Sequence, residues 1–248
     1  MKLLNFIFLI TLGRYACGGK ERVKAVKTIF NRPISYVPKT ENQRKYFESL
    51  EDKDTDLVVC TGPAGTGKTL FACIHGINLL KNGQINRIVI TRPVVPVDEE
   101  EIGFLPGSMV KKMDPWTRPL LDIFSGFYSK QAIEGMIQNN VIEISPLGYM
   151  RGRTLHNSYI IGDEMQNSSK KQMEMLLTRV GQGSKIVITG DLKQSDKPGT
   201  DNGLADFINR FNHKRENIKN IRHIKLSKED IKRSKLVEQV TYIYDEDE

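Results

Sequence analysis

Residues 62–69 have the types and spacing needed to hold a phosphate group. Their sequence, Gly-Pro-Ala-Gly-Thr-Gly-Lys-Thr, fits the phosphate-binding loop pattern G-x-x-x-x-G-K-[ST] at every fixed position. Glycines let successive backbone N–H groups turn inward around a phosphate, a path that side chains would obstruct. Lys68 is expected to reach the β- and γ-phosphate oxygens of a nucleotide, and the Thr69 hydroxyl to bind Mg²⁺. The residues expected to contact the nucleotide here are Gly62, Pro63, Ala64, Gly65, Thr66, Gly67, Lys68, Thr69 and Leu70.

Two carboxylates, Asp163 and Glu164, directly follow the apolar run at residues 159–162. An aspartate at the end of a buried strand can hold Mg²⁺ through water, so we assign Asp163 to the metal together with Thr69. Glu164 can orient and deprotonate the water that attacks the γ-phosphate, which favours hydrolysis over simple nucleotide binding. An apolar strand that ends in aspartate also occurs by chance, but the phosphate loop upstream favours the functional interpretation.

Two glutamines are further candidates for the nucleotide site. Gln194 follows the apolar run at residues 186–189, and ligands of open α/β sheets bind beyond the carboxyl ends of the strands. Its amide can donate and accept, which suits sensing a γ-phosphate or its attacking water; the alternative is an ordinary loop glutamine. Gln43 is a candidate for reading adenine, because a glutamine amide matches the donor and acceptor at adenine N6 and N7.

The elements that must position these residues alternate along the chain. A buried strand leads into the phosphate loop and a helix leaves it, so the positive end of the helix dipole adds to the phosphate site. Nearly all-apolar strands separated by helices predict an α/β fold, a mainly parallel sheet with helices on both faces. The expected strands are residues 57–60, 87–91, 141–144, 158–161 and 185–189, and the expected helices include residues 40–50, 69–80 and 168–180.

Composition fits one soluble globular domain with appendages. The chain has 248 residues, 39% hydrophobic and 27% charged, a formal net charge of +7 and a pI near 9.2. The basic balance favours a polyanionic partner. Three cysteines make no disulfide framework, and Cys60 and Cys73 are expected to be small core residues. No cysteine and histidine spacing indicates a metal site, so the nucleotide's Mg²⁺ is the only metal we expect.

The two ends of the chain are expected to be extensions of a domain at residues 33–240. Residues 1–32 form an apolar and basic extension that we expect to be poorly ordered, and residues 241–248 form an acidic tail. The apolar run at residues 3–12 resembles part of a signal peptide but is too short to span a bilayer. Because a domain that uses ATP needs cytosolic ATP, we expect a cytoplasmic protein with no integral membrane role.

Taken together, these motifs resemble the PhoH-like P-loop ATPases, which are related to the superfamily 1 helicases. The resemblance covers residues 39–240 and implies a single RecA-like P-loop NTPase domain, with Gln43 where the adenine-reading glutamine of the family belongs. One block departs from the family pattern, because Ser234 and Lys235 stand where histidine and proline are usual. The matching segments beyond the phosphate loop are residues 38–43, 91–95, 103–107, 114–116, 118–120, 150–155, 163–167 and 189–194.

A single RecA-like domain lacks the second domain with which a superfamily 1 helicase closes its ATP site. A positive charge near the γ-phosphate in the transition state can raise the rate by orders of magnitude, so a neighbouring subunit is expected to supply it. We therefore expect a homo-oligomeric ring, a hexamer by resemblance. Arg233, Arg151 and Arg153 are the candidates for this arginine finger; each could instead bind nucleic acid or face solvent.

Three functions compete at this point. The favoured one is an Mg²⁺-dependent ATPase that couples hydrolysis to remodelling or unwinding of single-stranded RNA or other nucleic acid. The alternatives are a nucleotide-binding regulatory or scaffold protein with little turnover, and a P-loop phosphotransferase with Arg151 and Arg153 as lid arginines. Side chains that could contact nucleic acid, or that could equally be core and ordinary solvated surface, are Lys111, Lys112, Trp116, Arg118, Phe124, Phe127 and Tyr128.

Overall fold

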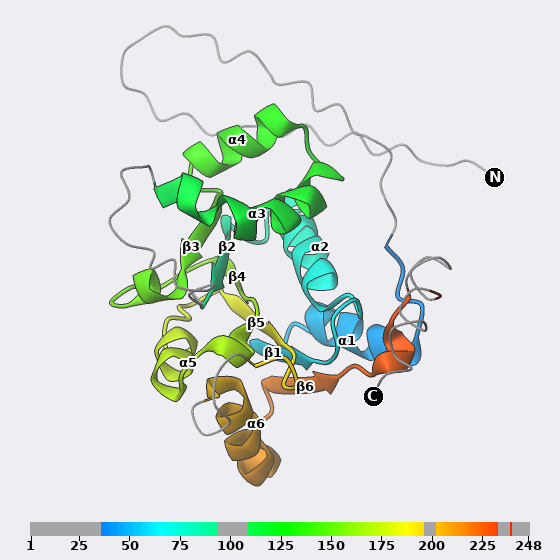
Figure 1. The fold of residues 1–248 in the computed structure, drawn as a ribbon. Helices are drawn as coiled ribbons and strands as arrows, with labels where there is room; N and C mark the ends of the chain where they lie inside the picture. The colour runs from blue at the N-terminus through cyan, green and yellow to red at the C-terminus, as the bar shows by residue number, and fades with distance from the viewer. Residues whose placement is uncertain (1–35, 94–108, 196–201, 233–238, 240–248) are drawn as a thin grey trace, which may run out of the picture.

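The computed structural model describes residues 36–93, 109–195, 202–232 and 239, and these fold around one parallel sheet (Figure 1). The sheet has six strands in the order β3-β2-β4-β5-β1-β6, and every neighbouring pair is parallel. This architecture confirms the α/β prediction. The strands are β1 (Leu57–Thr61), β2 (Arg87–Arg92), β3 (Ile142–Pro146), β4 (Ser158–Gly162), β5 (Lys185–Gly190) and β6 (Ile221–Lys225).

Helices cover both faces of the sheet, because side chains alternate between the two faces along each strand. Val58 of β1 belongs to the core cluster under α1, α2, α3 and α4, whereas Val59 belongs to the cluster under α5 and α6. Figure 1 shows α5 and α6 on the opposite side of the sheet from α2 and α3. The helices are α1 (Glu41–Glu51), α2 (Lys68–Lys81), α3 (Met109–Ser125), α4 (Lys130–Gln138), α5 (Lys170–Leu177) and α6 (Gly203–Lys214).

The elements β6 and α5 differ from the sequence prediction. The pattern analysis did not predict β6, because Arg222, His223 and Lys225 break its apolar character. This strand pairs with β1 alone, and an edge strand tolerates such charge. The helix expected at residues 168–180 is shorter: it begins at Lys170, after a capping box between Ser169 and Gln172, and ends at Leu177.

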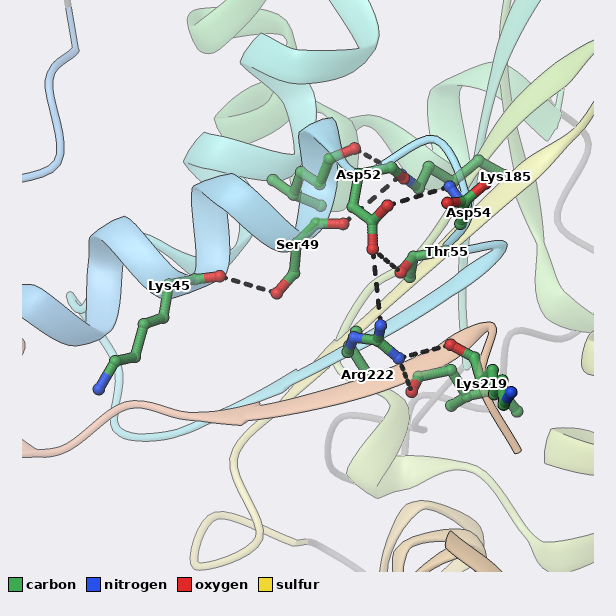
Figure 2. Close-up of polar contacts among 10 residues, drawn as sticks. Lys45, Ser49, Asp52, Asp54, Thr55, Lys185, Lys219 and Arg222 are labelled. Atoms are coloured by element: carbon green, nitrogen blue, oxygen red, sulfur yellow. Dashed lines mark hydrogen bonds and ion pairs between the residues drawn. The ribbon is translucent and has the colours of Figure 1, made fainter. Parts of the chain in front are cut away.

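The side chain of the half-buried Lys185 holds the C-terminal end of α1 (Figure 2). The Lys185 ammonium donates to the backbone carbonyls of Leu50 at 2.5 Å and Asp52 at 2.7 Å, which satisfies carbonyls that a helix end leaves without partners. Burial lowers the pKa of Lys185 to about 8. The Asp52 carboxylate in turn accepts from Thr55 at 2.6 Å and lies 3.7 Å from Arg222 of β6. These contacts join α1 to β5 and β6, and so help to fix the helix that begins beside the phosphate loop.

Within the described ranges, no helix is long and apolar enough to cross a membrane. The two expected extensions, residues 1–32 and 241–248, lie outside the described part of the chain. Of the expected domain at residues 33–240, the structure describes the ranges given above.

Candidate nucleotide-binding site

The phosphate loop connects the end of β1 to the start of α2 in a path that requires glycine. Gly62 has φ +152° and Gly67 has φ +92°, backbone conformations that L side chains rarely adopt. A Cβ on Gly62 would lie 2.6 Å from the carbonyl oxygen of Leu226, and a Cβ on Gly67 would lie 2.9 Å from the Phe71 ring. The loop is therefore wedged against the segment that follows β6 and against the first turn of α2.

Lys68 is buried beneath this loop, with 8% of its surface exposed. Its ammonium donates to the carbonyl of Gly62 at 2.6 Å and to that of Pro63 at 2.9 Å. The N-cap of α2 is Gly67, which has no side chain to accept a hydrogen bond. The first N–H groups of α2 therefore have no acceptor from the cap. A lysine and a helix N-terminus in one loop make a site for a phosphate anion.

Asp163 joins the two halves of the expected metal site. Its Oδ1 accepts a hydrogen bond from the Thr69 hydroxyl at 2.7 Å and another from the Thr189 hydroxyl at 2.6 Å. Its backbone N–H donates to the carbonyl of Thr91 at 2.9 Å, which fixes the residue at the end of β4. The structure thus brings together Thr69 and Asp163, the two residues that the sequence analysis assigned to Mg²⁺. It adds Thr189 at the end of β5, a residue to which the sequence analysis gave no role.

Glu164 is held in the left-handed region, with φ +52°, a conformation that costs a non-glycine residue about 1–2 kcal/mol. Its carboxylate accepts a hydrogen bond from the Gln166 amide at 2.6 Å and lies 3.9 Å from the guanidinium of Arg92 at the end of β2. Gln166 is buried, and its Oε1 accepts from the backbone N–H of Asp191 at 3.1 Å. Gln166 therefore links the ends of β4 and β5 and orients Glu164.

Arg92 and Gln166 had no assigned role in the sequence analysis. Both lie in segments that carried the family resemblance, which is the only signal that pointed to them. The backbone carbonyl of Gln194 accepts from the Gln166 amide at 3.3 Å, and the Gln194 residue is exposed at the same edge of the sheet as Glu164. Its expected role in sensing the γ-phosphate stays a prediction.

Gln43 lies beside the loop, but its amide is engaged by backbone from three segments. Its Nε2 donates to the carbonyls of Thr66 at 3.1 Å and Asp230 at 2.9 Å, and its Oε1 accepts from the backbone N–H of Lys39 at 2.8 Å. To read adenine, this amide would have to exchange one of these partners. Gln43 also lines a pocket of about 340 Å³ next to the loop, together with Tyr36, Val37, Lys39, Gly65, Thr66, Gly67, Leu70, Phe71 and Lys232.

Asp230 connects the C-terminal segment to the start of α1. Its carboxylate accepts from the Thr40 hydroxyl at 2.5 Å, the Asn42 amide at 3.0 Å and the backbone N–H of Ser227 at 2.7 Å. Burial would raise the pKa of Asp230, but these hydrogen bonds outweigh it and hold the pKa below its ordinary value. The S-x-x-D spacing of Ser227 and Asp230 is a capping pattern, the one sequence signal for this contact.

Two of the three expected arginine fingers, Arg153 and Arg151, lie in the segment after β3, away from the phosphate loop of their own chain. Arg153 makes a paired contact with Glu143 of β3, at 2.5 and 2.8 Å, and its hydrogen bond lowers the pKa of that carboxyl. Arg151 is exposed and follows β3, four strand positions from β1, a distance of about 19 Å at ordinary strand spacing. Arg233 lies outside the described residues.

Two of the four aromatic candidates for nucleic-acid stacking are in the core, which corrects that option for them. Phe124 is fully buried and Phe127 is 8% exposed, both packed in the cluster under α3 and α4. Tyr128 is partly buried with its ring 5.3 Å from the Lys81 ammonium. Arg118 is exposed, whereas the side chains of Lys111, Lys112 and Trp116 lie outside the described part. Cys60 and Cys73 are buried core residues, as expected, and burial raises the pKa of both thiols.

Comparison with known proteins places this site in a family. The PhoH-like protein family model matches residues 35–245. The PhoH-like protein of Bacillus subtilis (strain 168) is 44% identical over 208 residues, which are 84% of this chain and 63% of that protein. The Protein PhoH of Escherichia coli (strain K12) is 35% identical over 209 residues, 83% of this chain and 57% of that protein. The chain thus spans about three fifths of the length of the curated relatives it matches.

A solved structure supports the fold. The large terminase from a thermophilic bacteriophage superimposes with a TM-score of 0.51 at 12% identity, over 82% of this chain and 49% of that chain. At that identity the similarity concerns architecture, and it agrees with a RecA-like P-loop core. The match along most of the sequence, and the identity to several curated relatives, show that the chain belongs to the PhoH-like protein family.

Proposed function

We propose that this protein binds ATP with Mg²⁺ at the phosphate loop and hydrolyses it, and that turnover drives the remodelling or unwinding of single-stranded RNA or another nucleic acid in the cytoplasm. The observation that carries the proposal is the contact between Thr69, Asp163 and Thr189, which joins the phosphate loop to the ends of β4 and β5. Hydroxyl and carboxylate oxygens are the ligands that Mg²⁺ prefers, so Thr69 and Asp163 fit the ion. Bound there, Mg²⁺ would neutralise charge on the phosphate oxygens.

Hydrolysis is favoured over transfer to a substrate hydroxyl because Glu164 follows Asp163 at the end of β4. Gln166 and Arg92 restrain its carboxylate, which suits a base that orients a water molecule. Lys68 would exchange the carbonyls of Gly62 and Pro63 for phosphate oxygens when nucleotide binds. The phosphotransferase alternative needs a mobile lid arginine, and Arg153 is instead paired with Glu143.

The proposal includes assembly into a homo-oligomeric ring, a hexamer by resemblance to the family. Arg151 follows β3, which lies four strand positions, about 19 Å at ordinary strand spacing, from the strand that carries the phosphate loop. An arginine from a neighbouring subunit would supply the missing charge at the γ-phosphate, with Arg233, Arg151 and Arg153 as candidates.

The test is phosphate release from purified protein with ATP and Mg²⁺, with and without single-stranded RNA. Lys68→Ala should abolish turnover. Lys53→Ala should not change it, because Lys53 is exposed and precedes β1, at the end of the strands away from the phosphate loop. Glu164→Gln should retain ATP binding while turnover falls by about 10²–10⁴-fold. Turnover that is indifferent to RNA and DNA would refute the nucleic-acid coupling. An assembled oligomer without turnover would favour a regulatory nucleotide-binding protein.

A further inference from the structure

An exposed aromatic ring stands on a firmly packed turn at the carboxyl edge of the sheet. The turn is the short 3-10 helix η1 (Leu147–Met150), which follows β3 directly. Leu147 and Met150 are buried, with 1% and 0% of their surface exposed, whereas Tyr149 between them is 57% exposed. Burial of both neighbours fixes the backbone, so the outward position of the Tyr149 ring is built into the turn.

The residues after η1 are held as firmly. Arg153 is paired with Glu143 of β3, and its carbonyl accepts from the Arg179 guanidinium at 3.3 Å. Gly152 turns the chain with φ +75°. Arg151, between these anchors, is exposed. The turn therefore presents one aromatic ring and one guanidinium to solvent from a rigid base.

A groove of about 540 Å³ separates this turn from the start of α5, which packs beside η1. Its lining contains two cations, and no acidic side chain among the described residues that form it. A side chain built at Gly148 would meet no atom within 4 Å, so the groove is open beside the Tyr149 backbone. The lining residues are Gly148, Arg151, Ser169, Lys171, Gln172 and Met175.

We propose that this surface, defined by Tyr149, Arg151 and Lys171, binds a segment of single-stranded nucleic acid. A base stacks on the Tyr149 ring, and the backbone phosphates contact Arg151 and Lys171. An exposed ring two residues along the chain from an exposed arginine suits an unpaired strand, since every base offers a π-face and every linkage a negative charge. The inference rests on the proposed nucleic-acid coupling, and locates it on residues not considered for stacking from sequence.

The surface is connected to the catalytic carboxylate by a short, hydrogen-bonded stretch of chain. From Glu164 the backbone passes through the 3-10 helix η2 (Met165–Asn167) to Ser169, the cap of α5. Within it, the Asn167 N–H donates to the Glu164 carbonyl at 3.1 Å, and the Ser168 hydroxyl to the Met165 carbonyl at 2.7 Å. A strand bound at Lys171 therefore contacts the helix that directly follows the segment holding Glu164 and Gln166, which gives nucleic acid a route to stimulate turnover.

The experiment measures fluorescence anisotropy of labelled oligo(U) RNA and oligo(dT) DNA titrated with the full-length protein. Tyr149→Ala should weaken binding about 5- to 150-fold, the loss expected for one stacked base, while Tyr149→Phe should bind like the wild type. Gly148→Gln should also weaken binding, because its side chain fills the groove without disturbing the packing. Arg151→Ala should reduce the slope of log Kd against log salt concentration by about 1, the change expected when one phosphate contact is lost. Lys53→Ala is the matched control.

Each outcome decides a different question. If the wild type binds and both Tyr149→Ala and Gly148→Gln bind with the same affinity, this inference is overturned, whereas the proposed coupling stays intact. Absence of wild-type binding to both oligonucleotides would overturn both. Equal affinity for RNA and DNA is expected if stacking and phosphate contacts dominate, and a strong preference for RNA would assign a further contact to the 2′-hydroxyl. In Tyr149→Ala, basal phosphate release should persist while its stimulation by RNA is lost, and urea unfolding should match the wild type.

Discussion

Replacing Asp230 by alanine should destabilise the protein and loosen the wall of the nucleotide pocket. Asp230 is 1% exposed, and its carboxylate receives hydrogen bonds from two segments, from Thr40 and Asn42 at the start of α1 and from the backbone of Ser227 after β6. Its carbonyl also receives one from Gln43. The side chain thus ties the residues after β6 to the N-terminus of α1, on either side of the phosphate loop.

The magnitude follows from what each donor loses. The Ser227 N–H would be left without its acceptor in a partly buried position, which costs about 1–3 kcal/mol. Thr40 and Asn42 are partly exposed and can turn to water, so each loses about 0.5–1 kcal/mol. The sum is about 3 kcal/mol. With a urea m-value of about 3 kcal/mol/M, the unfolding midpoint should fall by about 1 M.

The assay is urea unfolding followed by circular dichroism, with the affinity for a fluorescent ADP analogue as the second measurement. Glu229→Ala is the matched control, because Glu229 is the exposed neighbour of Asp230 on the same turn. Affinity should fall in Asp230→Ala because Leu226 and Gln43 lose the support that holds them against Gly62 and Thr66. If both variants unfold at the wild-type midpoint, the reasoning about this carboxylate is wrong.

Three further changes test the packing around the site. Burial lowers the pKa of His75 from 6.5 to about 4, so between these pH values the unfolded chain binds a proton that the folded protein does not. The free energy of unfolding should therefore fall by up to about 3 kcal/mol as the pH falls from 6.5 to 4. Urea unfolding of His75→Leu should lack this pH dependence. Gly62→Ala should lower nucleotide affinity and should lower the free energy of unfolding by about 1–3 kcal/mol, because the new Cβ meets the Leu226 carbonyl. Gly135→Ala, in open space on α4, should be neutral or stabilising in the same unfolding assay. Lys185→Met should cost about 1–3 kcal/mol in thermal or urea unfolding, since the last carbonyls of α1 lose their donor; an unchanged midpoint would contradict this role of Lys185.

The parts of the site that sequence predicted are those in which chemistry requires neighbours along the chain. A phosphate loop needs its glycines, lysine and threonine within eight residues, because consecutive N–H groups surround one anion. The apolar runs predicted five of the six strands of a parallel sheet for a similar reason, since a strand buried on both faces is apolar at every position. The sixth, β6, escaped because an edge strand can carry charge on one side.

What tertiary structure alone decided is which distant side chains share a partner. Nothing in the pattern separates Tyr149, which is exposed, from Phe124, which is buried, because both are aromatic residues near helix ends. Likewise, only packing shows that the Arg153 guanidinium is paired with Glu143 of β3. Composition gives the kind of group, whereas packing decides whether it faces solvent.

The sequence by itself determined the nucleotide-binding loop, the α/β class and the pair of carboxylates at the end of β4. Only the fold determined that Thr189 and Thr69 meet on Asp163, and that Asp230 reaches across to Thr40, 190 residues away along the chain. Hydrogen bonds act over about 3 Å in space and carry no information about separation in sequence, so such contacts appear only when the sheet brings the carboxyl ends of its strands to one edge.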